Sequence, residues 1–437
     1  MTAEIAVMNK EAIALAADSA VTLSEEMGQK IFTSGNKIFA LSKYRPVGIM
    51  IYGNANFMGV PWETIIKIYR GKLGKKKFDA LKEYADDFID FLNAGHELFP
   101  ESIQEEYFRS HIYNYFHYIK REIEQRVEET ISEKEIITAE EIREITSKTI
   151  KKHYDAQKDA ELLPLFTKEH IETLIEKYQP IIDKAKKEVF KNLPIDEILS
   201  RQLEEIGVSL FTKSWLILPD YSGVVIAGFG TMNIFPSLRA FLIEGMVNNH
   251  LKYKEVGHSK ITFQNDAEII PFAQQEMVHA FMEGVEKNYQ NAIERDLSQI
   301  FAQYPEIIVD DIEKLNEDEK SDLKKRLKEI SSNMLSKYIQ RLEDYRRENY
   351  IEPIMKVVAI LPKDELAAMA ESLVNLTSFK RRVSIEAETV GGPIDVAVIS
   401  KGDGLIWIKR KHYFKAELNP HFFENYFKEV QNEEQAE

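Results

Sequence analysis

The threonine at position 2 is the first candidate nucleophile in this sequence. Met1 precedes a small residue, so we expect an aminopeptidase to remove it and leave Thr2 with a free α-amine beside its own hydroxyl. The ordinary pKa of such an amine is about 7.7–8.0. The amine can therefore accept the hydroxyl proton while Oγ attacks a carbonyl carbon, which is the chemistry of an N-terminal threonine nucleophile.

Three further residues could supply the charge and the hydrogen-bond donor that such a nucleophile needs. Asp18 follows the apolar run 12–16, and a hairpin between this run and the run 4–8 would bring it close to the threonine. Lys37 opens a third run, and a lysine buried beside Asp18 would lower the pKa values of the amine and the hydroxyl. Gly53 ends a fourth run just before a helix, where its amide could donate to a developing oxyanion.

Each of these residues also has a purely structural interpretation. Asp18 can cap the end of a strand, and Lys37 can be a surface lysine where a strand begins. Lys30 is an alternative partner for Asp18. Gly53 suits a tight turn whether or not its amide takes part in chemistry.

The spacing of apolar residues predicts strands towards both ends of the chain and helices between them. We expect strands at 4–8, 12–16, 38–41, 47–52, 215–218, 223–228, 238–243, 355–361, 394–399 and 405–409. We expect helices at 62–69, throughout most of 78–213, at 272–285, through most of 286–350, and at 364–381. Thr138 and Glu141 form a possible capping box at the start of one helix. The simplest arrangement is one α+β domain with two helical insertions.

Composition excludes several classes of protein. The 437 residues include 57 Lys+Arg and 72 Asp+Glu, and the net charge of −15 argues against a general nucleic-acid-binding surface. The sequence has no cysteine, which excludes disulfides, thiolate metal ligands and cysteine nucleophiles. We expect no membrane span, because no apolar run approaches roughly 20 residues. We expect no signal peptide either, so a cytoplasmic location is the default.

The motifs at the start of the chain resemble those of the proteasome β-subunit family of N-terminal nucleophile hydrolases, with the bacterial members HslV and Anbu closest in style. In that family the nucleophilic threonine is followed by an aspartate in an A-x-D-x-x-x-T pattern, and a lysine opens the third strand. Residues 16–22 (AADSAVT) match this pattern with the spacing from Thr2 intact, and Lys37 matches after a short insertion. Residues 53–56 match the turn before the first helix. The resemblance thus implies catalytic roles for Thr2, Asp18, Lys37 and Gly53.

A second, looser match lies towards the other end of the chain. An alanine-rich helix at 366–376 leads to the sequence EAETVGG at 386–392. The family has an acidic residue, a serine and a Gly-Gly pair at this place. The resemblance therefore implies site roles for Glu386 or Glu388 and for Thr389, which match the family's pair one residue out of register. The family's Gly-Ser-Gly turn before the third helix has no evident counterpart, which leaves the serine that holds the α-amine unassigned.

The resemblance also implies a fold and a reaction. The fold would be a four-layer αββα sandwich of residues 1–72, 215–285 and 355–415, with helical insertions at 73–214 and 286–354 and a tail at 416–437. The reaction would be amide hydrolysis through an acyl-ester on Thr2, without a cofactor or metal. The expected partners are a peptide or unfolded protein substrate, further copies of the chain, and possibly an ATPase that delivers substrate, but no nucleic acid and no membrane.

Three alternatives remain open at this point. The first is a scaffold or binding protein that keeps the fold without catalysis. The second is a small-molecule amidase in which the insertions close the pocket. The third is an adaptor whose helical insertions bind a partner.

Overall fold

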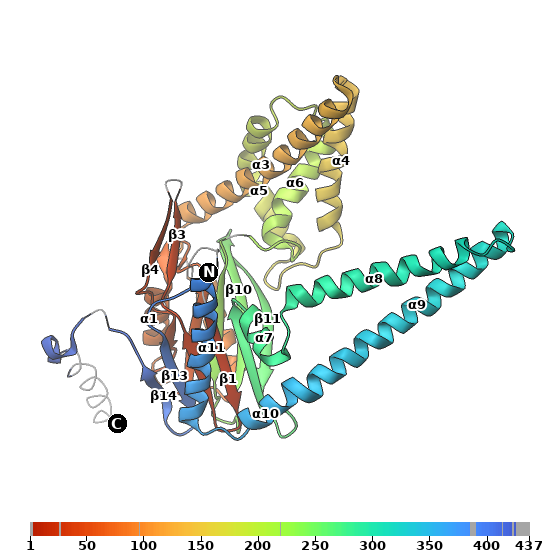
Figure 1. Ribbon diagram of the computed structural model, residues 1–437. Coiled ribbons are helices and arrows are strands. Elements are labelled where there is room, and N and C mark those ends of the chain that lie inside the picture. Colours follow the sequence, from red (N-terminus) through yellow and green to blue (C-terminus); the bar gives the residue numbers. More distant parts are fainter. Residues whose placement is uncertain are drawn as a thin grey trace. The chain divides into compact units, whose positions relative to one another are not determined.

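The computed structural model describes residues 3–25, 28–95, 97–218, 220–384, 390–412, 414–421 and 424, and it consists of two compact units (Figure 1). Unit 1 comprises Met1–Ile38 and Lys260–Glu437, and unit 2 comprises Phe39–Ser259. Both units combine helices with antiparallel strands, which confirms the expected mixture of α and β structure. Within the described residues, no helix has both the length and the apolar character needed to cross a bilayer.

Unit 1 contains a five-stranded antiparallel sheet in the order β12-β1-β2-β13-β14. Its strands are β1 (Ala3–Asn9), β2 (Ala12–Ala17), β12 (Ala267–Ala273), β13 (Asp395–Ser400) and β14 (Gly404–Lys409). The turn between β1 and β2 is stabilised by Asn9, whose Oδ1 accepts hydrogen bonds from the amides of Glu11 and Ala12 at 2.9 and 3.3 Å. Strand β2 pairs with β1 on one side and β13 on the other, so the sheet joins segments that are far apart in the sequence.

Helices cover one face of the unit 1 sheet. Helix α11 (Lys363–Val383) packs against β1 and β2, with α7 (Glu276–Glu283) and α10 (Glu352–Val358) contributing to the same core. Alternate residues of the two strands point into this core, namely Ala3, Ile5, Val7, Ala12, Ala14 and Ala16. The small alanines of β2 let α11 approach the sheet closely, because side chains on a strand alternate between its two faces.

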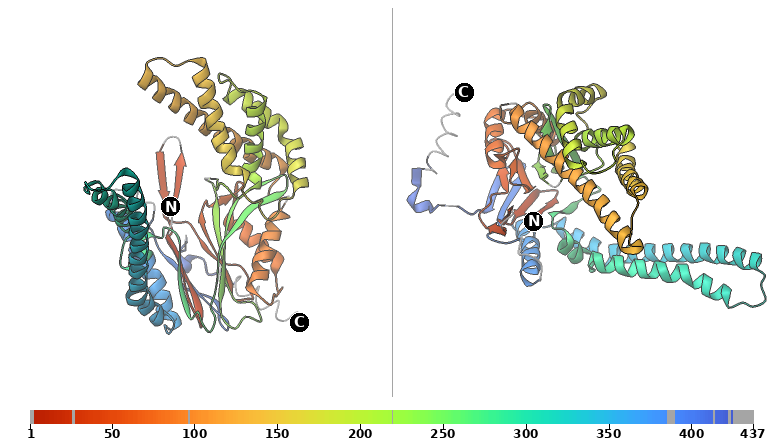
Figure 2. Two further views of the ribbon diagram at one scale, coloured as in Figure 1. Left: turned by 90° about the vertical axis from the view of Figure 1, so that its right-hand side faces the viewer. Right: turned by 90° about the horizontal axis from the view of Figure 1, so that it is seen from above.

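Two further pairs of elements belong to unit 1. Helices α8 (Lys287–Asp310) and α9 (Glu317–Arg346) form an antiparallel hairpin that projects from the sheet (Figures 1 and 2). The π-helical turn η1 (Arg347–Ile351) connects α9 to α10. Strands β3 (Val21–Glu25) and β4 (Gly28–Phe32) form a separate two-stranded ribbon.

Unit 2 contains the second five-stranded sheet, in the order β11-β10-β9-β6-β5. Its strands are β5 (Ile38–Ala40), β6 (Val47–Gly53), β9 (Ser222–Gly228), β10 (Ser237–Val247) and β11 (His250–Lys260). The short strands β7 (Asn56–Phe57) and β8 (Val60–Pro61) lead into helix α1 (Trp62–Leu73), which is followed by α2 (Leu81–Asn93). Both helices share a core with the sheet through residues such as Trp62, Tyr69 and Phe88.

The remaining helices of unit 2 have a core of their own. They are α3 (Glu101–Lys134), α4 (Ala139–Lys158), α5 (Lys168–Val189) and α6 (Glu197–Thr212), and they contribute buried residues such as Phe108, Tyr178 and Phe211. The capping box expected at the start of α4 is confirmed. The amide of Glu141 donates to Thr138 Oγ1 at 3.2 Å, and the amide of Thr138 donates to Glu141 Oε2 at 2.9 Å.

Two of the predicted strands are wrong. Residues 355–361 were expected to be extended, but α10 occupies 352–358, and Val358 is fully buried in the unit 1 core. Residues 215–218 form no strand, since Trp215 packs against the helical core of unit 2 and its Nε1 donates to the carbonyl of Ser209 at 3.2 Å. In both places tertiary packing outweighs the β-propensity of the local sequence. The predicted helix 272–285 is also shorter than expected, because β12 extends to Ala273.

Candidate functional site

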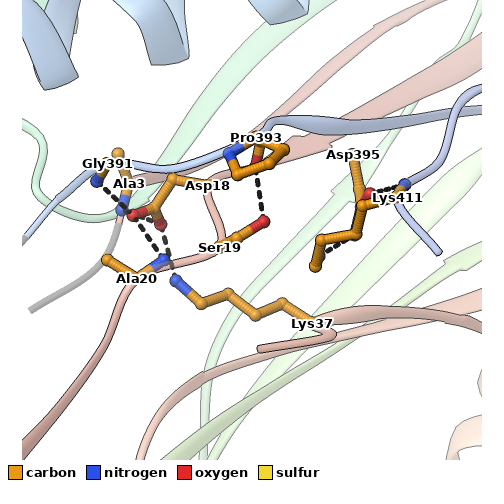
Figure 3. A network of polar contacts seen from close by, with 9 residues as sticks. All are labelled: Ala3, Asp18, Ser19, Ala20, Lys37, Gly391, Pro393, Asp395 and Lys411. Carbon is orange, nitrogen blue, oxygen red and sulfur yellow. Dashed lines mark hydrogen bonds and ion pairs between the residues drawn. The ribbon is translucent and has the colours of Figure 1, made fainter. Parts of the chain in front are cut away.

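Asp18 is at the centre of a network of polar contacts in unit 1 (Figure 3). The residue follows β2 directly and is 1% exposed. Its Oδ1 accepts hydrogen bonds from the amide of Ala3 at 3.0 Å and from Lys37 Nζ at 2.6 Å. Its Oδ2 accepts from the amides of Ala20 at 3.2 Å and Gly391 at 2.9 Å. Four donors therefore hold the carboxylate in one orientation, and such charge-assisted bonds are stronger than bonds between neutral groups.

The pairing of the first two strands explains why Asp18 lies beside Ala3. Glu4 is aligned with Ala17 in the antiparallel register, so the next position on each strand brings Ala3 opposite Asp18. The amide of Asp18 donates to the carbonyl of Ala3 at 3.1 Å, while the amide of Ala3 donates to the Asp18 side chain. The hairpin expected from the sequence thus places Asp18 next to the residue that follows Thr2. Thr2 itself lies outside the described residues.

Lys37 supplies a buried positive charge at this site. It lies immediately before β5, and its side chain is 6% exposed. Among the described residues, Asp18 is the one acceptor for Lys37 Nζ. Removing one partner of a buried ion pair leaves the other charge uncompensated, which typically costs 3–5 kcal/mol. Asp18 and Lys37 therefore depend on each other, and each fixes the position of the other.

The loop around Gly391 closes the site from the other end of the chain. Besides the Gly391 amide bond to Asp18, the amide of Ser19 donates to the Gly391 carbonyl at 3.1 Å, and Ser19 Oγ donates to the carbonyl of Pro393. Gly392 has a φ of +80°, and a Cβ there would lie 2.8 Å from Cβ of Thr33. Position 392 therefore requires glycine, both for its backbone conformation and for the space available.

An ion pair holds the segment that follows this loop. Asp395, the first residue of β13, is buried and accepts hydrogen bonds from the amide of Lys411 at 2.9 Å and from Lys411 Nζ. Figure 3 draws this pair together with Ser19 and Lys37. The pair ties β13 to the segment after β14, so it stabilises the strand that presents the Gly391 loop to Asp18.

Glu4 is a second buried carboxyl at the site, and the sequence analysis missed it. It is 2% exposed, and neither of its carboxylate oxygens has a hydrogen-bond partner among the described residues. Burial raises the pKa of Glu4 well above its usual value, whereas the charge of Lys37 acts to lower it and that of Asp18 to raise it further. The signal in the sequence was an acidic residue within the apolar run AEIAVM.

The other residues expected at the site belong to unit 2 or lie outside the described residues. Gly53 is the last residue of β6 in unit 2, with a φ of +81°, and a Cβ there would lie 2.7 Å from the carbonyl oxygen of Tyr221. Glycine is therefore required at position 53 by the local backbone. Glu386, Glu388 and Thr389 lie outside the described residues.

The arrangement in unit 1 suggests a specific chemical capability. A buried lysine held by a fully hydrogen-bonded carboxylate lowers the pKa of neighbouring amines and hydroxyls and stabilises negative charge nearby. Among the residues that the structure describes, no group of three or more Asp, Glu or His is placed to hold a metal ion. Hydrogen bonds bring together residue 3, residues 18–20, residue 37 and residue 391.

Comparison with known proteins does not identify a family. The sequence matches no family model, and no curated protein is significantly similar to it. The function must therefore be argued from the residues of the site.

Proposed function

We propose that this chain is an amide hydrolase of the N-terminal threonine type, with Thr2 as the nucleophile after removal of Met1. The observation that carries the proposal is the buried Asp18–Lys37 ion pair, whose aspartate also binds the amide of Ala3, the residue next to Thr2. If the α-amine and hydroxyl of Thr2 lie near Lys37, its charge favours their deprotonated forms. Glu4, two positions from the nucleophile, adds a buried carboxyl whose pKa is raised by its burial.

In the proposed reaction, the α-amine of Thr2 accepts the hydroxyl proton while Oγ attacks the carbonyl carbon of an amide. When the tetrahedral intermediate collapses, the C–N bond breaks, the leaving nitrogen takes the proton, and an ester remains on Oγ. Water then attacks the ester, which releases a carboxylic acid and restores the threonine hydroxyl. Lys37 would supply positive charge throughout, and Asp18 would keep Lys37 in place.

The remaining expectations from the resemblance form part of the same proposal. The four-layer αββα sandwich is supported by the finding that each unit contains a five-stranded antiparallel sheet with helices packed on it. An oxyanion donor at Gly53 and site roles for Glu386 and Thr389 stay predictions. Peptides or unfolded protein segments are the proposed substrates, in a homo-oligomer and with delivery by a partner protein.

Intact mass spectrometry tests the nucleophile directly. The purified protein is measured with and without a threonine-directed β-lactone or epoxyketone probe, alongside the variant Thr2→Ala and the matched control Thr22→Ala. We expect loss of Met1 and a single adduct, which is absent from Thr2→Ala and present in Thr22→Ala. Retention of Met1, or a processed chain that neither probe modifies, would contradict the proposal and favour a non-catalytic scaffold.

Substrate assays separate the two catalytic alternatives once an adduct has been found. A peptidase should release product from short fluorogenic peptides, and Thr2→Ala should abolish that release. Turnover of small amides without turnover of peptides would assign the chain to the small-molecule amidases instead.

A further inference from the structure

The α8–α9 hairpin exposes an apolar stripe along each of its helices. The stripe on α8 has side chains that are 39–63% exposed, namely Tyr289, Ile293, Ile300, Tyr304 and Ile307. The stripe on α9 has side chains that are 40–59% exposed, namely Ile330, Met334, Tyr338, Leu342 and Tyr345. Large apolar side chains scattered singly over a surface are ordinary, but a contiguous set is typical of an interaction site.

Helical geometry places the members of each stripe together. At about 100° per residue, the five residues of the α8 stripe lie within roughly 60° of one another. The less exposed residues Leu297 and Phe301 of α8 lie roughly 60° and 100° from the mean direction of the stripe. The exposed stripe is therefore distinct from the face through which α8 packs on α9.

The two stripes lie on the same side of the hairpin. On α9 the less exposed residues Leu335 and Ile339 lie roughly 80° and 120° from the mean direction of the stripe, in the same rotational sense as on α8. Because α8 and α9 run antiparallel, a stripe that is rotated in the same sense from the packing face of each helix lies on the same side of the hairpin. The structure thus presents a single apolar face, formed by the ten residues of the two stripes, which we call the hairpin face.

The hairpin face is large enough for a stable protein–protein interface. Its ten side chains together expose roughly 1,000 Å², compared with about 800 Å² per partner in a standard interface. On α8 the stripe runs from Tyr289 to Ile307, so the face extends over about 27 Å. Within unit 1, α7 and η1 pack at the base of the hairpin, and α8 and α9 continue well beyond them (Figures 1 and 2).

The charges of the hairpin favour a second copy of the same chain as the occupant. The two helices carry ten Lys and Arg and eleven Asp and Glu, a net charge of −1, whereas the whole chain carries −15. Two hairpins can therefore approach each other without the repulsion expected of the whole molecules. A nucleic acid or a strongly acidic partner would require an excess of positive charge that the hairpin does not have.

The position of two charged residues fits a two-fold arrangement. Ion pairs between Glu306 and Lys328 at 2.6 Å and between Asp310 and Lys324 at 2.7 Å set the register of the hairpin. In this register Asp296, which adjoins the α8 stripe, lies within one helical turn of the level of Arg341, which adjoins the α9 stripe. When α8 of one copy packs on α9 of the other, each Asp296 faces an Arg341, so the two-fold contact contains two complementary charge pairs.

We propose that the hairpin face is a self-association surface, on which a second copy of the chain packs its own hairpin to form an intermolecular four-helix bundle. Such a bundle buries the apolar stripes of both copies, as the helices of a single-chain bundle do. The inference holds whether or not Thr2 is a nucleophile, since none of the residues involved belongs to the Asp18 site.

The absence of cysteine allows a spin label to be placed at one chosen position in the full-length protein. Gln303→Cys, at the edge of the α8 stripe, is labelled with a nitroxide, and distances between copies are measured by pulsed dipolar spectroscopy. Helices in contact have axes 8–10 Å apart, so we expect a distance distribution below roughly 30 Å. Dilution with unlabelled chain should reduce the dipolar signal in proportion to the fraction of doubly labelled pairs.

Two double variants of equal added charge make the test specific. Ile300→Glu with Ile307→Glu places two charges in the stripe, and we expect the association to weaken at least about 100-fold. Asn291→Glu with Ala302→Glu places two charges on the opposite, exposed side of α8 and should leave the association unchanged. Circular dichroism verifies that both variants keep their helices. Light scattering then compares the mass with that of the 50.6 kDa monomer.

Two results would overturn the proposal. The first is the absence of any short distance between labels in the parent protein at micromolar concentration, which would mean that the face serves another partner. The second is equal weakening by the two double variants, because the stripe would then have no special role.

Discussion

Both units of the molecule contain a buried lysine–carboxylate pair, and the two pairs differ in what surrounds them. Lys37 and Asp18 of unit 1 are 2.6 Å apart, and so are Lys252 and Glu244 of unit 2. All four side chains are at most 6% exposed. By distance and burial alone the two pairs cannot be told apart.

The hydrogen bonds of Lys252 and Glu244 identify their pair as structural. Lys252 Nζ also donates to the carbonyls of Leu210 at 2.7 Å and Leu216 at 3.3 Å, and Glu244 accepts from the amide of Leu218 at 2.7 Å. The pair therefore ties β10 and β11 to the end of α6 and the segment after it. Burial raises the pKa of Glu244 and lowers that of Lys252, and in each case the partner's charge opposes the shift.

In the unit 1 pair, most of the hydrogen bonds are made by the carboxylate and not by the lysine. Asp18 has four donors, whereas Lys37 has one acceptor among the described residues and has the unpartnered carboxyl of Glu4 nearby. A lysine whose ammonium group can still donate hydrogen bonds can act on a neighbouring group. A lysine whose donors are all bonded to other groups cannot. The burial of an ion pair is thus weak evidence of function. A buried lysine that can still donate hydrogen bonds to a neighbouring group is stronger evidence.

The largest effect on stability should come from breaking the pair in unit 2. Lys252→Met leaves Glu244 buried without its cation, so we expect the free energy of unfolding to fall by about 3–5 kcal/mol. Urea denaturation followed by circular dichroism measures this change. The double variant Lys252→Met with Glu244→Leu should recover most of the loss, because no uncompensated charge remains. A loss below about 1 kcal/mol in the single variant would show that the pair is not a structural tie.

Breaking the pair in unit 1 should affect reactivity more than stability. Lys37→Met leaves Asp18 with three backbone donors, so the free energy of unfolding should fall less than for Lys252→Met. We expect labelling of Thr2 by the β-lactone probe to slow at least 100-fold, or about 2.7 kcal/mol in the barrier. Lys252→Met, assayed under conditions where it is folded, should be labelled at the parental rate. Equal slowing in both variants would remove the distinction between the two pairs.

The adjacent glycines of the 391–392 loop provide a matched test of the backbone around Asp18. Gly392→Ala must adopt a φ of +80° with its Cβ 2.8 Å from Thr33, so we expect a loss of about 1–3 kcal/mol in the free energy of unfolding and slower probe labelling. For Gly391→Ala the nearest atom to the new Cβ is 4.0 Å away, and the change should be small. Thermal denaturation compares the two variants, and the prediction is wrong if Gly391→Ala is the less stable one.

The smallest effect should be a change in the pH dependence of stability at Glu4. The pKa of this residue is higher in the folded state than in the unfolded state, so its contribution to stability is fully present below the unfolded pKa and is lost as the pH rises through the folded pKa. Glutamine cannot titrate. Glu4→Gln should therefore gain stability relative to the parent protein as the pH is raised from 4 to 8, which denaturation at several pH values measures. Parallel pH profiles for the two proteins would argue against a protonated Glu4.

The part of the site that the sequence predicts is the part that forms locally. The hairpin of β1 and β2 needs only the apolar runs 4–8 and 12–16 and the turn at Asn9, so the contact between Asp18 and Ala3 follows from a short stretch of sequence. Lys37 is also near in sequence, at the start of the apolar run 38–41.

Contacts over long sequence separations could not be derived in this way. The donor role of Gly391 depends on the pairing of β13 with β2, and nothing in the local sequence around Asp18 specifies that neighbour. The same limit explains the error at 355–361, where the alternation of apolar residues suits a strand but the packing of Val358 in the unit 1 core favours a helix. The burial of Glu4 could not be predicted either, because its place in an apolar run does not show whether its side chain faces the core or water.

The separation of Asp18 from Gly391 has a consequence for protein synthesis. The two residues are 373 positions apart, and a ribosome that adds about 5–20 residues per second needs roughly 20–75 s to pass from one to the other. During that time unit 2, which is continuous in sequence, is made completely, whereas β2 still lacks its neighbour β13 and Asp18 lacks one of its donors. The nascent chain thus cannot assemble the Asp18 network until translation has passed the Gly391 loop, so the order of synthesis itself keeps the network incomplete on the ribosome.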